Sequence, residues 1–180
     1  MQRVLTKDAA EVLAWPGLSN HQARGRIHRW AVAGILPHLG KSGVGAKASW
    51  QFDRETVVIA AVLFALFDLV GVHDAARLRA AYTLLADHAE GDDGPTLITA
   101  ILNDIESGAL PVLAATVWSH PSGSVCTSFA VRLGAEFKRL LIAPAENTEP
   151  IWHGVLELAP LLRRFIDNQD NVTPLHKAGA

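Results

Sequence analysis

The sequence predicts an α+β protein with a mostly helical first half that contains one β-hairpin. The second half is a smaller α+β unit with an antiparallel β-hairpin or sheet. Apolar residues recur at spacings of three and four through much of residues 5–89 and again at 97–106, as in helices that bury one face. Two β-rich runs at 112–118 and 125–133 flank the turn-forming sequence HPSGS, which indicates a hairpin. These patterns together predict the α+β class.

The composition is that of a globular chain. Its 180 residues are 49% hydrophobic and 19% charged, which is typical of a protein that folds around a core. The richest apolar run, 57–72, contains Asp68 and is too short to span a bilayer, and residues 1–12 lack the apolar segment of a signal peptide. Cys126 is the single cysteine, which excludes an intrachain disulfide framework and a CxxC motif. We expect a cytoplasmic protein with no membrane partner.

The first half is predicted to begin with two helices joined by a turn. The first, over residues 5–13, has Thr6 as its N-cap, and WPG at 15–17 ends it because proline lacks a backbone donor and glycine favours a turn. The second spans about 19–33 and closes at Gly34. Its apolar face carries Ala23, Ile27, Trp30 and Ala31, and its polar face carries Asn20, His21, Gln22, Arg24, His28 and Arg29.

A basic, glycine-rich segment follows and predicts a two-stranded hairpin over about 39–51. Its flexible tip combines Gly40, Gly43 and Gly45 with Lys41 and Lys47. Asp53 is the predicted N-cap of the next helix, which begins at Arg54. Gly71 separates that helix from another over 72–89.

A composition break at EGDDGP, residues 90–95, predicts two domains. The first covers 1–90, the linker 91–95 and the second 96–180. The second domain is expected to contain the helix 97–106, the hairpin strands 112–118 and 125–133, further strands at 137–143 and 151–158, and a closing helix at 161–167.

Charge is distributed unevenly along the chain. Residues 1–54 contain eight Lys or Arg and three Asp or Glu, a net charge of +5, whereas the remainder carries a net charge of −7. A polyanion is therefore attracted to the first third of the chain and repelled by the rest.

The first half resembles the MerR-type winged helix-turn-helix over about residues 4–88. The likeness is carried, in order, by GRIHRWAVAGILP, by the hairpin closing in WQFDRETV, and by FDLVGVHDAARLRAAY. The family's second helix leaves through a Gly-Leu-Leu-like exit, here GIL at 34–36, and its wing closes on an aromatic residue and Asp, here FD at 52–53. The resemblance implies binding to double-stranded DNA as a symmetric dimer. This sequence has a longer turn at 15–18, and HRW at 28–30 where the family has Arg-Tyr-Tyr.

The resemblance and the charge distribution predict a sequence-specific transcriptional regulator. The second helix would enter the major groove, and the basic hairpin would contact the backbone or the minor groove. No long coiled-coil helix follows the module, so a homodimer is expected to form through the C-terminal half. The candidate DNA-binding residues are Asn20, His21, Gln22, Arg24, Arg26, His28, Arg29, Lys41 and Lys47. No catalytic residue, metal site or cofactor is expected.

Two other functions fit the same module: a phage-type architectural, recombination or packaging factor that acts on DNA, and a protein-interaction module that no longer binds it. Enzyme and metal interpretations are weaker, because no HxxxH or HxH pair occurs and GKSGVGAK lacks the order of a phosphate loop. His120 with Cys126 has no accompanying oxyanion-hole signature. Trp30 is interpreted as core and Trp50 as hairpin packing. The operator, the sign of regulation and any small-molecule effector stay open.

Overall fold

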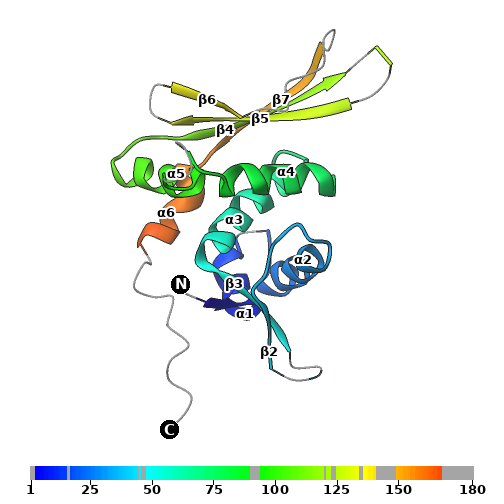
Figure 1. Cartoon of the computed structure of the whole chain (residues 1–180), viewed down its shortest axis with the longest axis vertical. Coiled ribbons are helices and arrows are strands. Elements are labelled where there is room, and N and C mark those ends of the chain that lie inside the picture. The colour runs from blue at the N-terminus through cyan, green and yellow to red at the C-terminus, as the bar shows by residue number, and fades with distance from the viewer. Residues whose placement is uncertain are drawn as a thin grey trace.

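The computed structural model describes residues 3–15, 17–43, 45, 48–89, 94–119, 121–122, 125–133, 136–140 and 149–167. Within these ranges the fold contains six helices and two antiparallel sheets, which confirms the predicted α+β class. The larger sheet lies at one end of the molecule, and α1, α2 and the small hairpin lie at the other (Figure 1). Helices α3, α4 and α5 lie between these two ends.

The small sheet joins the N-terminus to the hairpin in the order β1-β3-β2. Strand β3 (Ser49–Asp53) lies between β1 (Arg3–Leu5) and β2 (Gly40–Ser42), and buried Val4 pairs with buried Phe52. The sequence predicted the β2–β3 hairpin but not β1, which is only three residues long and pairs far along the chain.

Helix α1 (Thr6–Leu13) begins where the sequence predicted, but the predicted cap is wrong. Thr6 is the first residue of the helix, Leu5 occupies the cap position, and no side chain caps the helix. The Thr6 hydroxyl instead donates a hydrogen bond to the Trp50 carbonyl at 3.1 Å. Thr6 therefore fastens α1 to β3.

Helix α2 (Asn20–Val32) follows a short turn in which Trp15 and Leu18 exchange backbone hydrogen bonds. Ser19 and Gln22 form a capping box, in which each side chain bonds to the other residue's backbone. Gly34 follows the helix with φ of 66°, a conformation that favours glycine. The predicted apolar face is buried: Ala23, Ile27, Trp30 and Ala31.

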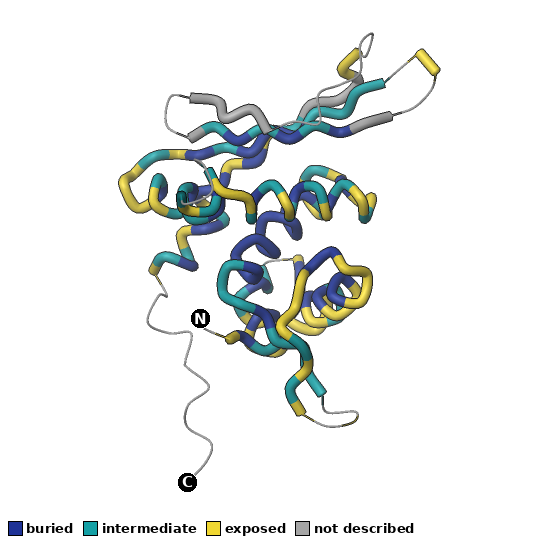
Figure 2. Tube along the Cα trace, in the orientation of Figure 1, coloured by how far each residue is buried: buried dark blue, intermediate teal, exposed yellow. Residues whose placement is uncertain are grey.

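Helix α3 (Arg54–Asp68) is the most buried element, as the dark tube in Figure 2 shows. Asp53 caps it as predicted, accepting a hydrogen bond from the Thr56 amide at 2.6 Å. The Thr56 hydroxyl shares a 3.0 Å hydrogen bond with the hydroxyl of Tyr82 in α4 (Ala75–Ala86), where burial raises the tyrosine pKa. Helix α4 starts at Ala75, three residues after the predicted start at 72. Asp74 is its N-cap.

The second half has the predicted elements, although residues 141–143 of one predicted strand lie outside the described residues. Helix α5 spans Leu97–Glu106 and α6 spans Ala159–Asp167. The larger sheet has the order β6-β5-β4-β7, with bounds Glu136–Leu140, Val125–Leu133, Val112–Ser119 and Glu149–Glu157. Its inner face buries Leu113, Ala115, Phe129, Val131 and Leu156.

The two halves share a buried core. One cluster of buried apolar residues extends from Val4 to Phe165, and the Arg54 side chain donates to the Phe165 carbonyl at 2.9 Å. Most of the predicted linker, 91–93, lies outside the described residues, and the proposed division into two domains stays a prediction. No helix among the described residues is long and apolar enough to cross a membrane.

The Asp53 cap gives a stability prediction. Asp53→Ala removes the oxygen that accepts the Thr56 amide hydrogen, so the free energy of unfolding in urea should fall by about 1 kcal/mol. Glu11→Ala is the control, because Glu11 is an exposed acid within α1 that caps nothing, and it should change stability by less than about 0.5 kcal/mol. Equal losses in the two variants would contradict the assigned role of Asp53.

Candidate nucleic-acid interface

The outward face of α2 is polar and carries no acidic residue. Because four apolar positions turn one side of the helix inward, most of the remaining positions face solvent. The exposed side chains among the candidates are Asn20, His21, Gln22, Arg24, His28 and Arg29. The amide groups at the start of α2 add a partial positive charge to this face. The helix thus presents donors and cations together.

Arg24 and Arg29 are the uncommitted cations of this face. Neither makes a side-chain hydrogen bond or an ion pair within the described part of the chain. The Arg29 guanidinium lies over Gly25, with Nη1 3.6 Å from the place a Cβ of Gly25 would occupy. The missing side chain at Gly25 leaves room for this guanidinium against the helix.

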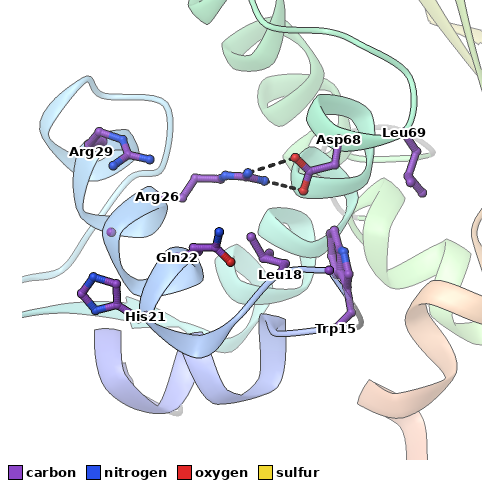
Figure 3. Close-up of a pocket in the computed structure, with 10 residues that line it drawn as sticks. Trp15, Leu18, His21, Gln22, Arg26, Arg29, Asp68 and Leu69 are labelled. Atoms are coloured by element: carbon purple, nitrogen blue, oxygen red, sulfur yellow. Dashed lines mark hydrogen bonds and ion pairs between the residues drawn. The ribbon is translucent and has the colours of Figure 1, made fainter.

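Arg26, a predicted DNA contact, is instead engaged within the protein. Its guanidinium forms a two-pronged ion pair with Asp68 at the end of α3, at 2.6 and 2.9 Å (Figure 3). It also lies 4.8 Å from the Phe64 ring centre and 4.6 Å from that of Phe67, and only 13% of its side chain is exposed. Such a bidentate pair beside aromatic faces is a structural clamp, so we remove Arg26 from the candidate contacts.

Gln22 is also partly committed inside the protein. Its side-chain oxygen accepts hydrogen bonds from both the amide and the hydroxyl of Ser19, each at 2.9 Å. Recognition of an adenine edge uses both the oxygen and the nitrogen of an amide side chain. Gln22 therefore holds the start of α2, and Asn20, exposed on the first turn, is the better placed amide.

A groove of about 630 Å³ runs between α2 and the end of α3 (Figure 3). Gln22, Arg29 and the Arg26–Asp68 pair line one part of it, and Trp15 and Leu69 line another. Asp68 is the one carboxylate that lines the groove among the described residues. Its charge is compensated by Arg26, so the groove stays favourable to an anion near α2.

The base of the hairpin joins α2 through Trp50. The Lys41 ammonium lies 4.3 Å from the Trp50 ring centre, the His38 ring stacks against it at 4.0 Å, and the His28 ring of α2 lies 6.4 Å away. Lys41 remains exposed while touching the indole. Lys47 lies outside the described residues. We call Lys41 and five exposed residues of α2 together the α2–hairpin surface: Asn20, His21, Arg24, His28, Arg29 and Lys41.

The two tryptophans pack as predicted. Trp30 is 6% exposed and its ring makes an edge contact with Phe64 at 4.8 Å, which confirms it as core. Trp50 is half-buried beneath Lys41 and His38, and its indole Nε1 is buried without a hydrogen-bond acceptor among the described residues. His38 was not predicted as part of this cluster. Its position just before the hairpin is the one signal in the sequence for this contact.

No group of three or more His, Cys, Asp or Glu side chains that could hold a metal occurs among the described residues. Of the pair considered for nucleophilic chemistry, His120 lies outside the described residues and Cys126 is described only as a backbone position in β5.

A scan against protein-family models and searches of curated proteins and of solved structures found no match to this chain.

The Arg26–Asp68 pair gives a second stability prediction. Arg26→Ala leaves Asp68 without its partner, and we expect a loss of about 2 kcal/mol in the free energy of unfolding. A double-mutant cycle with Asp68→Ala should return a coupling energy of about 1–2 kcal/mol. Arg24→Ala on the same helix should change stability by less than about 0.5 kcal/mol. A coupling energy near zero would show that the pair does not orient α2.

Proposed function

We propose that this chain is a transcriptional regulator that binds double-stranded DNA through a winged helix-turn-helix, as in MerR-type proteins. The module would consist of α1, α2, the β2–β3 hairpin and α3. The observation that supports this best is the α2–hairpin surface, on which Arg24, Arg29 and Lys41 are exposed and no acidic side chain of α2 opposes them.

The dimensions of α2 suit a DNA groove. A helix of 13 residues is about 20 Å long, and the major groove of B-form DNA accepts one helix. The first turn carries Asn20 and His21, and Arg24 lies on the next turn. We assign base contacts to these residues and phosphate contacts to His28, Arg29 and Lys41. Lys47, predicted from sequence alone, belongs to the same hairpin segment.

The hairpin would act as the wing. Gly43, with φ of 90°, and Gly45, with φ of 63°, adopt backbone conformations that favour glycine. The absence of a side chain at these two positions would let the hairpin approach a phosphate backbone closely. The contact between His28 and Trp50 then sets the angle between the wing and the recognition helix.

A symmetric operator requires two copies of the module. We assign dimerisation to the C-terminal half, where the larger sheet lies far from the α2–hairpin surface (Figure 1). The net charge of −7 beyond residue 54 would keep that half away from the duplex.

DNA binding by α2 is tested with substitutions of its two uncommitted arginines. Fragments selected from genomic DNA with the purified protein supply the duplex, and gel mobility shifts measure affinity. Arg24→Ala and Arg29→Ala should each weaken binding by about 5- to 50-fold, with unchanged melting temperature, because each removes about 1–2 kcal/mol of contact. Arg163→Ala, an exposed arginine on α6, is the matched control and should bind normally.

Unaltered binding in both α2 variants would remove this helix from the interface. Selected fragments that contain tandem sites, that bend strongly and that leave nearby transcription unchanged would favour an architectural or recombination factor. Failure to bind any genomic fragment would favour a protein-interaction module.

The role of the wing is tested by salt dependence. Each phosphate contact releases a counterion, so the logarithm of affinity falls linearly with the logarithm of salt concentration. Lys41→Ala should reduce this slope by about one and weaken binding similarly on all sequences. Lys7→Ala provides the control, because Lys7 is an exposed lysine of α1 outside the α2–hairpin surface. An unchanged slope for Lys41→Ala would exclude a phosphate contact there.

A further inference from the structure

The groove beside α2 has a polar end and an apolar end. Arg29 lines it on the α2 side, whereas Trp15 and Leu69 line the side toward the end of α3. The Arg26–Asp68 pair lies between these two ends (Figure 3). The groove volume of about 630 Å³ falls in the range of small-molecule sites, which combine apolar walls with a few polar groups.

The polar end forms a seat for an anion at Gly25. Arg29 is exposed and makes no side-chain hydrogen bond or ion pair within the described part of the chain. Its guanidinium lies over Gly25, with Nη1 3.6 Å from the place a Cβ would occupy, and is directed toward Arg26 (Figure 3). His21, one turn before Gly25, lines the groove on the same side of the helix. Arg29 and His21 therefore flank Gly25 from its two sides.

Gln22 adds a further donor at this end of the groove. Its side-chain oxygen accepts hydrogen bonds from the Ser19 amide and hydroxyl, so its amide nitrogen is the group left to donate to a ligand. A phosphate group has three strong acceptor oxygens, one for each of Arg29, His21 and Gln22, whereas a carboxylate has two. The polar end therefore favours a phosphate.

The apolar end favours a planar ring. Trp15 is half-buried and is held by its edge contact to Phe64 at 6.1 Å, which fixes the indole at the wall of the groove. Leu69 beside it is 71% exposed although it is a large apolar residue. An aromatic base packs well on such a wall, because every base has a π-face that an aromatic side chain can contact.

We propose that this groove binds a nucleoside monophosphate. The phosphate lies between Arg29 and His21, and the base lies against Trp15 and Leu69. Asp68, between the two ends, is 26% exposed and has acceptor sites beyond the two that its ion pair uses, so it can accept from ribose hydroxyls. The proposal does not depend on DNA binding. Where the chain also binds DNA, the two ligands compete, because Arg29 and His21 belong to the α2–hairpin surface.

Titration calorimetry of the full chain with adenosine monophosphate (AMP) tests the proposal. Adenosine lacks the phosphate, and ribose 5-phosphate lacks the base. We expect AMP to bind one site with a dissociation constant of about 1 mM or tighter, and at least about tenfold more tightly than either analogue. Absence of AMP binding, or equal binding of either analogue, would overturn the proposal.

Charge substitutions on α2 locate the phosphate. Arg29→Gln should weaken AMP binding by about tenfold or more, whereas Arg24→Gln, at an exposed arginine of α2 outside the groove, should not. Gly25→Glu places a carboxylate in the phosphate seat and should weaken AMP binding to a similar degree. Val32→Glu, at a position of α2 that is 67% exposed, is its matched control. Unchanged AMP affinity in both Arg29→Gln and Gly25→Glu would overturn the proposal.

A leucine substitution locates the base. Leu69→Ser removes apolar surface from the rim and should weaken AMP binding by about threefold or more. Leu110→Ser, at another exposed leucine, is the matched control and should leave AMP affinity unchanged. Because both side chains are exposed, neither substitution threatens the fold. Equal AMP affinity in the two variants would overturn the placement of the base.

Discussion

The complete burial of α3 is the constraint on which the rest of the structure depends. Eleven consecutive residues, 56–66, are buried, so the helix has no solvent-facing stripe and must be covered on every side. Each large apolar side chain in this run contributes about 1.5–3 kcal/mol on burial. Neighbours from both ends of the chain supply the cover, because α3 contacts α1, α4, α5, α6 and β3. Both halves of the chain therefore contribute to the cover of α3.

The rotation of α2 about its axis is supported by an ion pair with the polar end of α3. Asp68 is the first charged residue after the buried run of α3, and it meets Arg26 beside two phenylalanine rings. The pair costs desolvation, which the aromatic contacts and the two hydrogen bonds offset. With Arg26 drawn inward, Arg24 is turned toward solvent because two positions correspond to more than half a turn of helix. The ion pair thus holds Arg26 inward, while the buried apolar face of α2 sets which of its other residues are exposed.

Local signals account for the parts of the fold that the sequence predicts well. The cap at Asp53 acts between residues three apart in the chain, and the apolar face of α2 follows from spacings of three and four, so both can be predicted without a structure. Strand β1 and the Thr6–Trp50 bond join segments more than 40 residues apart, and nothing local encodes them. For the same reason, the sequence did not predict the ion pair of Arg26. The one local signal was a lone aspartate at the end of the apolar run, and its partner lies 42 residues earlier.

The turn at 15–18 connects the buried core to the start of α2. Trp15 is held by an edge contact to Phe64 of α3 at 6.1 Å, and its backbone bonds to Leu18 immediately before the Ser19 cap of α2. The buried α3 therefore fixes the turn from which α2 begins.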